Sequence, residues 1–313
     1  MSETRHYVDL DGARLFVRAM GTGPAIVFVH GFPQTSNAWS KQIRPIADAG
    51  YKVIAPDLRG FGRSSGPGKV DGYDADTVSA DLVGLLDWAG EKDAVFVGHD
   101  IGAIIVWHLA RAHPSRVRGV AALSVPCLPR ATRPPTELLS AALGQDHYLL
   151  FFQVPDEPEK VLSRDVRRTL LTEGNWTEEW GQSDFVPTRP PWLSEAELKE
   201  EIALFTRTGF SPPLGYYRNF DRNWELGARF GEGLVRQPAL FITGSEDLVR
   251  TISPAQAMKS IVPDLRSHVL AGAGHFIQQE RPEQVNGLLL DFFRELDGAV
   301  SEACADNPDT GEA

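Results

Sequence analysis

Three residues of the chain, Asp100, Asp247 and His275, have the types and the order that nucleophilic catalysis by a triad requires. Asp100 lies at the centre of GHDIG, residues 98–102, which fits the glycine-flanked turn that raises a nucleophile between a strand and a helix. A carboxylate suits this role because it is already ionised at pH 7. An isolated aspartate in such a turn is more often only a helix N-cap. The order of the three residues favours catalysis, since each one follows an apolar run that reads as a strand.

Two backbone amides are expected beside the nucleophile. Ile101 follows Asp100 directly, and Phe32 follows the apolar run at residues 25–30 within the segment VHGFP. Their N–H groups would form an oxyanion hole that stabilises the intermediate of ester hydrolysis. The sequence therefore predicts two steps: Asp100 attacks a carbon atom and becomes esterified, and then water activated by His275, which Asp247 orients, releases the product.

The elements that must position these residues can be read from apolar periodicity. Continuous apolar runs, typical of strands that are covered on both faces, occur at residues 25–30, 51–57, 94–100, 117–126, 238–244 and 267–272. Asp11-Gly12 predicts a hairpin, residues 75–89 have helical spacing with Gly90 as a stop, and residues 282–296 read as a closing amphipathic helix. This alternation predicts an α/β fold with a mostly parallel central sheet and helices on both faces.

The alternation stops after residue 128, and the chain becomes helical and rich in proline and aromatic residues until about residue 232. Ser194 and Glu197 form a capping box, and Gly209 ends the helix that they begin. We expect residues 129–232 to be an inserted helical cap over the strand ends, between core segments 1–128 and 233–297. The acidic residues 298–313 are expected to be a disordered tail.

Composition excludes several classes of protein. The chain has 313 residues and a net charge of −11, which argues against nucleic-acid binding, and it has no apolar run long enough for a membrane span. Two cysteines, Cys127 and Cys304, make no disulfide framework, and the histidines show no metal-ligand spacing. We therefore expect a cytoplasmic protein with no metal and no cofactor; a homodimer stays open.

The motifs resemble the α/β-hydrolase superfamily and, more narrowly, the soluble epoxide hydrolases. HGFPQT, PDLRGFGRSS, VGHDIGA, SEDLV and GAGHFIQQERP match core motifs of that family in order. In the segment expected to be the cap, DHYLLFFQVP and LGYYRNFDRNWE resemble the segments that carry two tyrosines, which map onto Tyr148 and Tyr217. The resemblance covers nearly the whole chain except the tail, and it implies the α/β-hydrolase fold with an inserted cap.

The resemblance also implies a reaction. In the family, the two phenols hold the oxygen of an epoxide above the nucleophile, so the expected substrates are water and a small apolar epoxide, the product is a vicinal diol, and detoxification is the expected role. Many relatives have tryptophan where this chain has Ile101, which leaves the backbone donor intact but changes the shape of the pocket. The residues expected to contact substrate are Phe32, Pro33, Ile101, Trp107 and Gln153.

Two other functions fit the same scaffold. Haloalkane and haloacid dehalogenases use the same Asp–His–Asp catalytic triad. Their halide leaving group, however, is stabilised by N–H donors and needs no proton donor. Dehalogenases usually place tryptophan or arginine beside the nucleophile, where this chain has Ile101 and Ile104. A catalytically silent ligand-binding protein is the second alternative, and it would have no need of an intact triad with two tyrosines.

Overall fold

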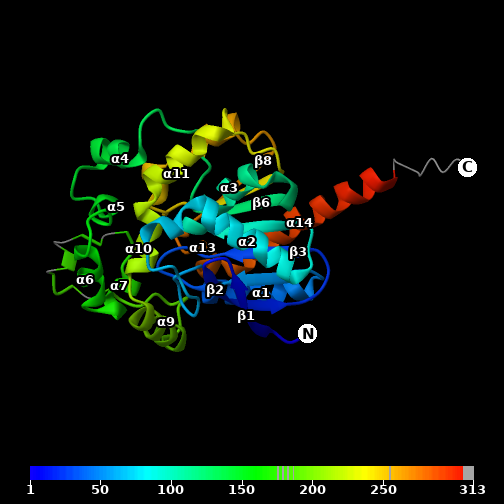
Figure 1. Cartoon of the computed structure of the whole chain (residues 1–313). Coiled ribbons are helices and arrows are strands. Elements are labelled where there is room, and N and C mark those ends of the chain that lie inside the picture. Colours follow the sequence, from blue (N-terminus) through cyan, green and yellow to red (C-terminus); the bar gives the residue numbers. More distant parts are fainter. Residues whose placement is uncertain (175, 178–179, 182, 186, 254, 306–313) are drawn as a thin grey trace, which may run out of the picture.

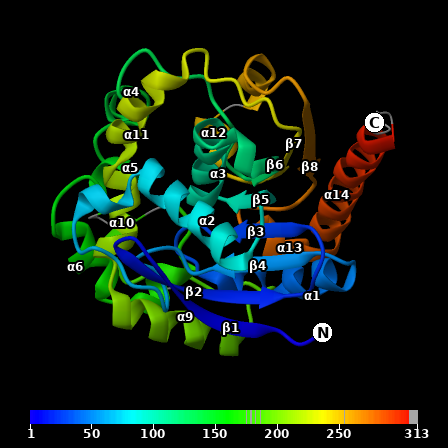
Figure 2. The ribbon, with the colours of Figure 1, turned by 45° about the vertical axis from the view of Figure 1, so that its right-hand side comes forward.

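A computed structural model of the chain describes residues 1–313 except 175, 178–179, 182, 186, 254 and 306–313. Its centre is an eight-stranded sheet with the order β1-β2-β4-β3-β5-β6-β7-β8. The strands are β1 (Thr4–Leu10), β2 (Ala13–Met20), β3 (Ala25–Val29), β4 (Lys52–Pro56), β5 (Ala94–His99), β6 (Val117–Leu123), β7 (Ala239–Gly244) and β8 (Leu265–Leu270). β1 pairs with β2 and β2 with β4 in antiparallel fashion, and all other pairs are parallel. The mostly parallel sheet is thus confirmed, and Figure 2 shows β1 and β8 at its two edges.

The apolar runs form strands because both faces of the sheet are covered. Along β3, Val27 and Val29 belong to one hydrophobic cluster, whereas Ile26 and Phe28 belong to the other. Successive side chains of a strand point to opposite faces, so a strand buried on both sides must be apolar throughout. The first cluster lies under α2 (Ala75–Ala89) and α3 (Ile101–Ala112), and the second lies under α1 (Ser40–Asp48) and α14 (Pro282–Ala305).

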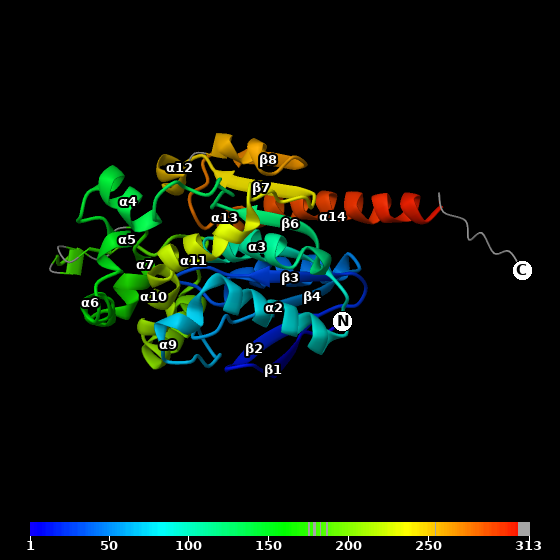
Figure 3. The same ribbon diagram turned by 45° about the horizontal axis from the view of Figure 1, so that its top comes forward.

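The second large part of the structure is a group of helices between β6 and β7. They are α4 (Pro135–Leu143), α5 (Tyr148–Phe151), α6 (Glu157–Ser163), α7 (Val166–Leu171), α9 (Glu195–Thr208), α10 (Ser211–Arg218) and α11 (Phe220–Leu226). These helices, here called the cap, gather at one end of the sheet, and α14 extends away from the opposite end (Figures 1 and 3). The predicted capping box of Ser194 and Glu197 is present at the start of α9, and Gly209 caps its end.

The remaining elements are short. They are α12 (Val249–Ile252), α13 (Ile277–Glu280), and the 3-10 helices η1 (Ser36–Trp39), η2 (Val70–Tyr73), η3 (Pro114–Arg116), η4 (Gly227–Phe230) and η5 (Ala255–Ser260). Within the described residues, none of the helices combines the length and the apolarity that crossing a bilayer demands.

The end of the chain differs from the expectation. The predicted tail begins at residue 298, but α14 continues to Ala305. Alanine and glutamate are strong helix formers, so residues of this type extend a helix even after its apolar stripe has stopped. The remainder of the predicted tail, residues 306–313, lies outside the described residues.

Candidate active site

Asp100 occupies a sharp turn between β5 and α3, as the GHDIG segment predicts. Its backbone has φ 54° and ψ −120°, a conformation that non-glycine residues rarely adopt and that stores strain. The flanking glycines make the turn feasible, since a Cβ at Gly98 would collide with the carbonyl of Gly102, and one at Gly102 would collide with the carbonyl of Val29. The turn therefore lifts the carboxylate above the carboxyl ends of the strands.

The carboxylate of Asp100 is held from two sides. The backbone N–H of Phe32 donates to Oδ1 over 2.9 Å, and Nε2 of His275 lies 3.5 Å from Oδ2. Burial raises the pKa of Asp100, but the hydrogen bond and charge of His275 outweigh it and leave the pKa below its ordinary value. Asp100 is consequently an ionised nucleophile. Phe32 thus lies where it was predicted, with its amide directed at the group that would be esterified.

His275 follows β8 and lies between two carboxylates. Its Nδ1 is 3.2 Å from Oδ1 of Asp247, which follows β7, and 2.9 Å from the hydroxyl of Ser124, which follows β6. Burial lowers the pKa of His275, but the hydrogen bonds and charges of Asp100 and Asp247 raise it to about 10. The imidazole is therefore protonated while Asp100 is free. The backbone at Ser124 also has a positive φ, 72°, so the third strand end beside the triad is strained as well.

The two tyrosines approach the nucleophile from the cap. Tyr148 begins α5, Tyr217 lies on α10, and both line the cavity that contains Asp100, Asp247 and His275. Burial is the main cause that raises the pKa of each phenol, and the negative charge of Asp100 raises both further. Both phenols are therefore fully protonated near neutral pH and are available as proton donors in the cavity that Asp100 also lines.

The cavity has a volume of about 270 Å³ and lies between the cap and the strand ends. It is a partly open chamber in which apolar side chains alternate with polar and charged groups, as in sites that bind and transform a small molecule. Its lining residues are Phe32, Asp100, Leu143, His147, Tyr148, Glu173, Gly174, Trp176, Tyr217, Asp247, Leu248, Val249, Thr251, Ile252, His275 and Phe276. Five predicted catalytic residues and Phe32 are thus brought together.

The other four residues expected to contact substrate lie outside this lining. Ile101 is buried in the core cluster, Trp107 donates from Nε1 to the carbonyl of Val125 over 3.2 Å, and Pro33 lines a neighbouring cavity. Gln153 donates to the carbonyl of Tyr217 over 3.1 Å, so it holds the backbone of α10 instead of facing the chamber. Helical spacing and motif position gave no information about which way these side chains turn.

Sequence reasoning missed Ser124, Glu173 and Trp176. Ser124 had a usable signal, because it ends a predicted strand at the edge of the sheet where active sites lie. Glu173 follows α7, and Trp176 donates from Nε1 to the carbonyl of Thr169 over 3.0 Å. Both belong to an irregular cap segment without a motif or periodicity, so nothing local in the sequence marked them.

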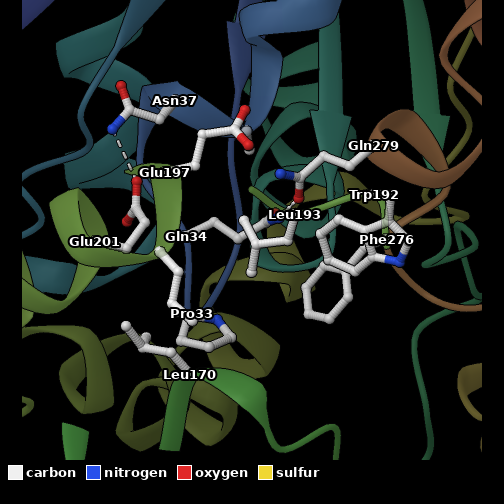
Figure 4. A pocket seen from close by; sticks show the side chains of 12 residues that line it. Pro33, Gln34, Asn37, Leu170, Trp192, Leu193, Glu197, Glu201, Phe276 and Gln279 are labelled. Atoms are coloured by element: carbon white, nitrogen blue, oxygen red, sulfur yellow. Dashed lines mark hydrogen bonds between the residues drawn. The ribbon is translucent and has the colours of Figure 1, made fainter. Parts of the chain in front are cut away.

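Figure 4 shows the neighbouring cavity, which has a volume of about 40 Å³. Glu201 of α9 accepts hydrogen bonds there from the Thr35 hydroxyl (2.7 Å) and from Nδ2 of Asn37 (2.9 Å). Gln34 donates to Gln279 in the same cavity. This cavity contains no member of the triad and marks the contact between the cap and the loop that follows Phe32.

A hydrogen-bond network leads from this second cavity to the triad. Oε1 of Gln34 lies 3.1 Å from Nδ1 of His99, and Nε2 of His99 lies 2.9 Å from the backbone carbonyl of His275. Burial is the main cause that lowers the pKa of His99 to about 4, so its ring is neutral and serves as a structural link. Among the described residues, no group of three His, Cys, Asp or Glu side chains is arranged to hold a metal ion.

Comparison with known proteins places this geometry in a family. Residues 24–282 match the model of the α/β hydrolase fold family. Epoxide hydrolase A of Mycobacterium tuberculosis is 42% identical over 94% of this chain and 98% of its own length, and epoxide hydrolase 3 of Siraitia grosvenorii is 34% identical over 95% and 100%. The crystal structure of epoxide hydrolase A from Mycobacterium thermoresistibile, 39% identical, superposes with a TM-score of 0.86 and covers 94% of this chain and 98% of its own.

Proposed function

Since the chain belongs to the α/β-hydrolase fold family and, within it, to the epoxide hydrolases, we propose that it converts an epoxide and water into a vicinal diol through an ester formed on Asp100. The observation that carries the proposal is the presence of two protonated phenols, Tyr148 and Tyr217, in the lining of the same chamber as an ionised, partly buried carboxylate. A nucleophile and an acid that face each other are what opening a strained ether demands.

In the first step, a carboxylate oxygen of Asp100 attacks a ring carbon of the epoxide and the carbon–oxygen bond breaks. The departing alkoxide receives a proton from the phenols of Tyr148 and Tyr217, whose protonated state is favoured by burial. An aspartate suits this step because its product is an ester, which water can cleave. A serine in the same place would leave an ether, which this set of groups does not hydrolyse.

Ester formation itself prepares His275 for the second step. The pKa of about 10 in the resting state depends on the negative charges of Asp100 and Asp247. Esterification removes the negative charge of Asp100. One of the two charges that stabilise the protonated imidazole is then lost, so the pKa of His275 falls. The proton released from His275 restores the phenol that gave up its own. His275 thus becomes a neutral base once the ester has formed, when the second step needs it, while Asp247 keeps it oriented.

In the second step, His275 removes a proton from water, and the resulting hydroxide attacks the ester carbonyl of Asp100. The N–H of Phe32, which already contacts Oδ1 over 2.9 Å, and the N–H of Ile101 stabilise the tetrahedral oxyanion. Loss of one such donor typically costs about 2.7–4 kcal/mol of barrier. As the intermediate collapses, His275 returns its proton to the departing alkoxide and the diol leaves. The new carboxyl group of Asp100 then gives its proton to His275, which restores the resting ion pair, and no cofactor takes part.

The two rival functions receive less support. A halide leaving group needs N–H donors in the chamber, but the indole N–H of Trp176, which lines it, donates to a backbone carbonyl, as does that of Trp107. A ligand-binding protein without catalytic activity would not need the strained turn at Asp100 or the ion pair between Asp100 and His275. Incubation with styrene oxide and with 1-chlorobutane separates the three functions, because the products are diol, halide or neither.

The covalent step has a direct test. A single turnover in heavy-oxygen water with excess enzyme should place the label in the carboxylate of Asp100, because water attacks the ester carbonyl and the diol takes its new oxygen from the protein. Mass spectrometry of the peptide that contains residue 100 reads the result. Label found only in the diol would mean that water attacks the epoxide directly, and the covalent mechanism would be wrong.

A further inference from the structure

The chamber of the candidate active site has an unbalanced charge. Three carboxylates line it, from Asp100, Asp247 and Glu173, and none of the described lining residues is lysine or arginine. Protonated His275 balances one carboxylate of the triad. Burial lowers the pKa of His147, the other histidine of the lining, so this ring adds no compensating positive charge near pH 7. Glu173 therefore adds a negative charge to a triad that is already negative.

Glu173 has no role in the steps of the proposed reaction. It lies in the cap just after α7 (Val166–Leu171) and is exposed to solvent, so it lies at the rim of the chamber that the cap forms. Burial and the charges of Glu280 and Asp247 raise its pKa, and the positive charge and backbone N–H of His275 oppose that change only in part. The carboxyl group is thus close enough to the triad to share its electrostatic environment.

Apart from the carboxylates, the two phenols and the two histidines, Thr251 is the one other residue among the described lining residues with a polar side chain besides the Trp176 indole, and its hydroxyl donates to the carbonyl of Leu248 over 2.7 Å. The apolar members of the chamber wall are Phe32, Leu143, Trp176, Leu248, Val249, Ile252 and Phe276. A cavity of about 270 Å³ lined by three carboxylates holds a bound epoxide and these charges together. The width of such a cavity is comparable with the screening length of about 8 Å at physiological salt, so charges on the substrate and on the wall interact.

From this arrangement we infer that Glu173 is a specificity residue that makes the enzyme prefer neutral and cationic epoxides and discriminate against epoxides that carry a carboxylate. The inference rests on the proposed function, because it concerns the substrate class of the same chamber. An anionic substrate would have to enter past Glu173 and approach Asp100 without any cation to pair with its charge. A quaternary ammonium substituent would gain from the same carboxylates and from the face of Trp176.

The test uses three styrene oxides that differ in charge: the 4-carboxamide, the 4-carboxylate and the bulkier 4-(trimethylammonio)methyl compound. The value of kcat/KM for diol formation is measured for each with the wild-type protein, Glu173→Gln and Glu232→Gln. Glu232 is an exposed residue outside the chamber lining, so its substitution removes the same charge elsewhere. The carboxamide and carboxylate have nearly the same shape, and comparing ratios between variants cancels their intrinsic reactivities.

We expect the wild-type protein to favour the carboxamide over the carboxylate about tenfold. Glu173→Gln should reduce that ratio about fivefold and remove most of the advantage of the ammonium compound, whereas Glu232→Gln should behave as wild type. Equal use of carboxylate and carboxamide by the wild-type protein would overturn the inference even if Glu173→Gln did not fold, and so would unchanged ratios in a folded Glu173→Gln. Diol formation from these substrates would still support the proposed function. No diol from any of the three would contradict both.

Discussion

The carboxyl group of Glu201 joins the cap to the core and should make that junction sensitive to pH. Glu201 lies on α9 and accepts hydrogen bonds from Thr35 and Asn37, which directly follow the Phe32 segment. Its second oxygen, Oε2, is buried and has no hydrogen-bond partner among the described residues. Burial raises the pKa of Glu201 from 4.5 to about 7, although the two hydrogen bonds oppose the change. The folded protein thus favours the protonated carboxyl group.

The sign and size of the effect follow from linkage. An acid whose pKa is raised by folding contributes stability that is complete below its unfolded pKa of 4.5 and is lost as the pH rises through about 7. Between pH 5.5 and pH 8 the loss is about 2 kcal/mol of unfolding free energy for a shift of this size. For a chain of 313 residues this corresponds to roughly 3 °C in Tm.

Glu201→Gln should remove this dependence, because the amide keeps an acceptor oxygen for Thr35 and Asn37 and does not titrate. Thermal unfolding is followed by circular dichroism from pH 5.5 to pH 8. The difference in Tm between the variant and the wild-type protein should shift by about 3 °C in favour of the variant over this range. Glu200→Gln is the matched control, because Glu200 is the adjacent residue and its exposed side chain pairs with Arg63. The Tm of this variant should depend on pH as the Tm of the wild-type protein does. Parallel curves for wild type and Glu201→Gln would refute the reasoning.

Three predictions concern catalysis. Asp100→Ala should abolish diol formation while the protein stays folded, which activity and circular dichroism together can show; residual single-turnover diol would argue against a covalent carrier. His275→Gln should let the ester form and persist, visible as a mass increase equal to that of the substrate; absence of that adduct with intact ring opening would assign the base elsewhere. Tyr148→Phe and Tyr217→Phe should each slow ring opening about a hundredfold and the double variant more, as stopped-flow fluorescence can report; normal rates in the double variant would mean that other groups supply the proton.

The parts of the site that the sequence predicted are those fixed by local backbone geometry. The glycines around Asp100 can only serve a tight turn, and β7 and β8 bring Asp247 and His275 to the same sheet edge because parallel strands end together. These relations depend on periodicity and chain order, both of which a single sequence contains. Phe32 could be placed for the same reason, since it follows β3.

The cap was harder to predict because its helices are positioned by packing over long sequence separations. Trp107 and Gln153 were expected in the chamber, but their N–H groups are taken by backbone carbonyls of Val125, Leu149 and Tyr217. Helical spacing identifies a buried side of a helix without saying whether that side meets a cavity or a neighbour. The position of Glu173 beside His275 depends on the fold of an irregular segment, for which residues near it in sequence give no signal.

The adjacency of Tyr216 and Tyr217 on α10 limits how this helix can change. Tyr216 points into the core, where its hydroxyl donates to the carbonyl of Arg59 over 3.0 Å, and Tyr217 points into the chamber. Successive residues of an α-helix are rotated by about 100°. Deleting one residue upstream within α10 would therefore move Tyr217 to the place of Tyr216, which faces the core, and Tyr216 to the place of Gly215, which packs against Tyr73. The loops between the cap helices can thus vary in length, but an insertion or deletion inside α10 upstream of Tyr217 would remove one of the two proton donors from the chamber.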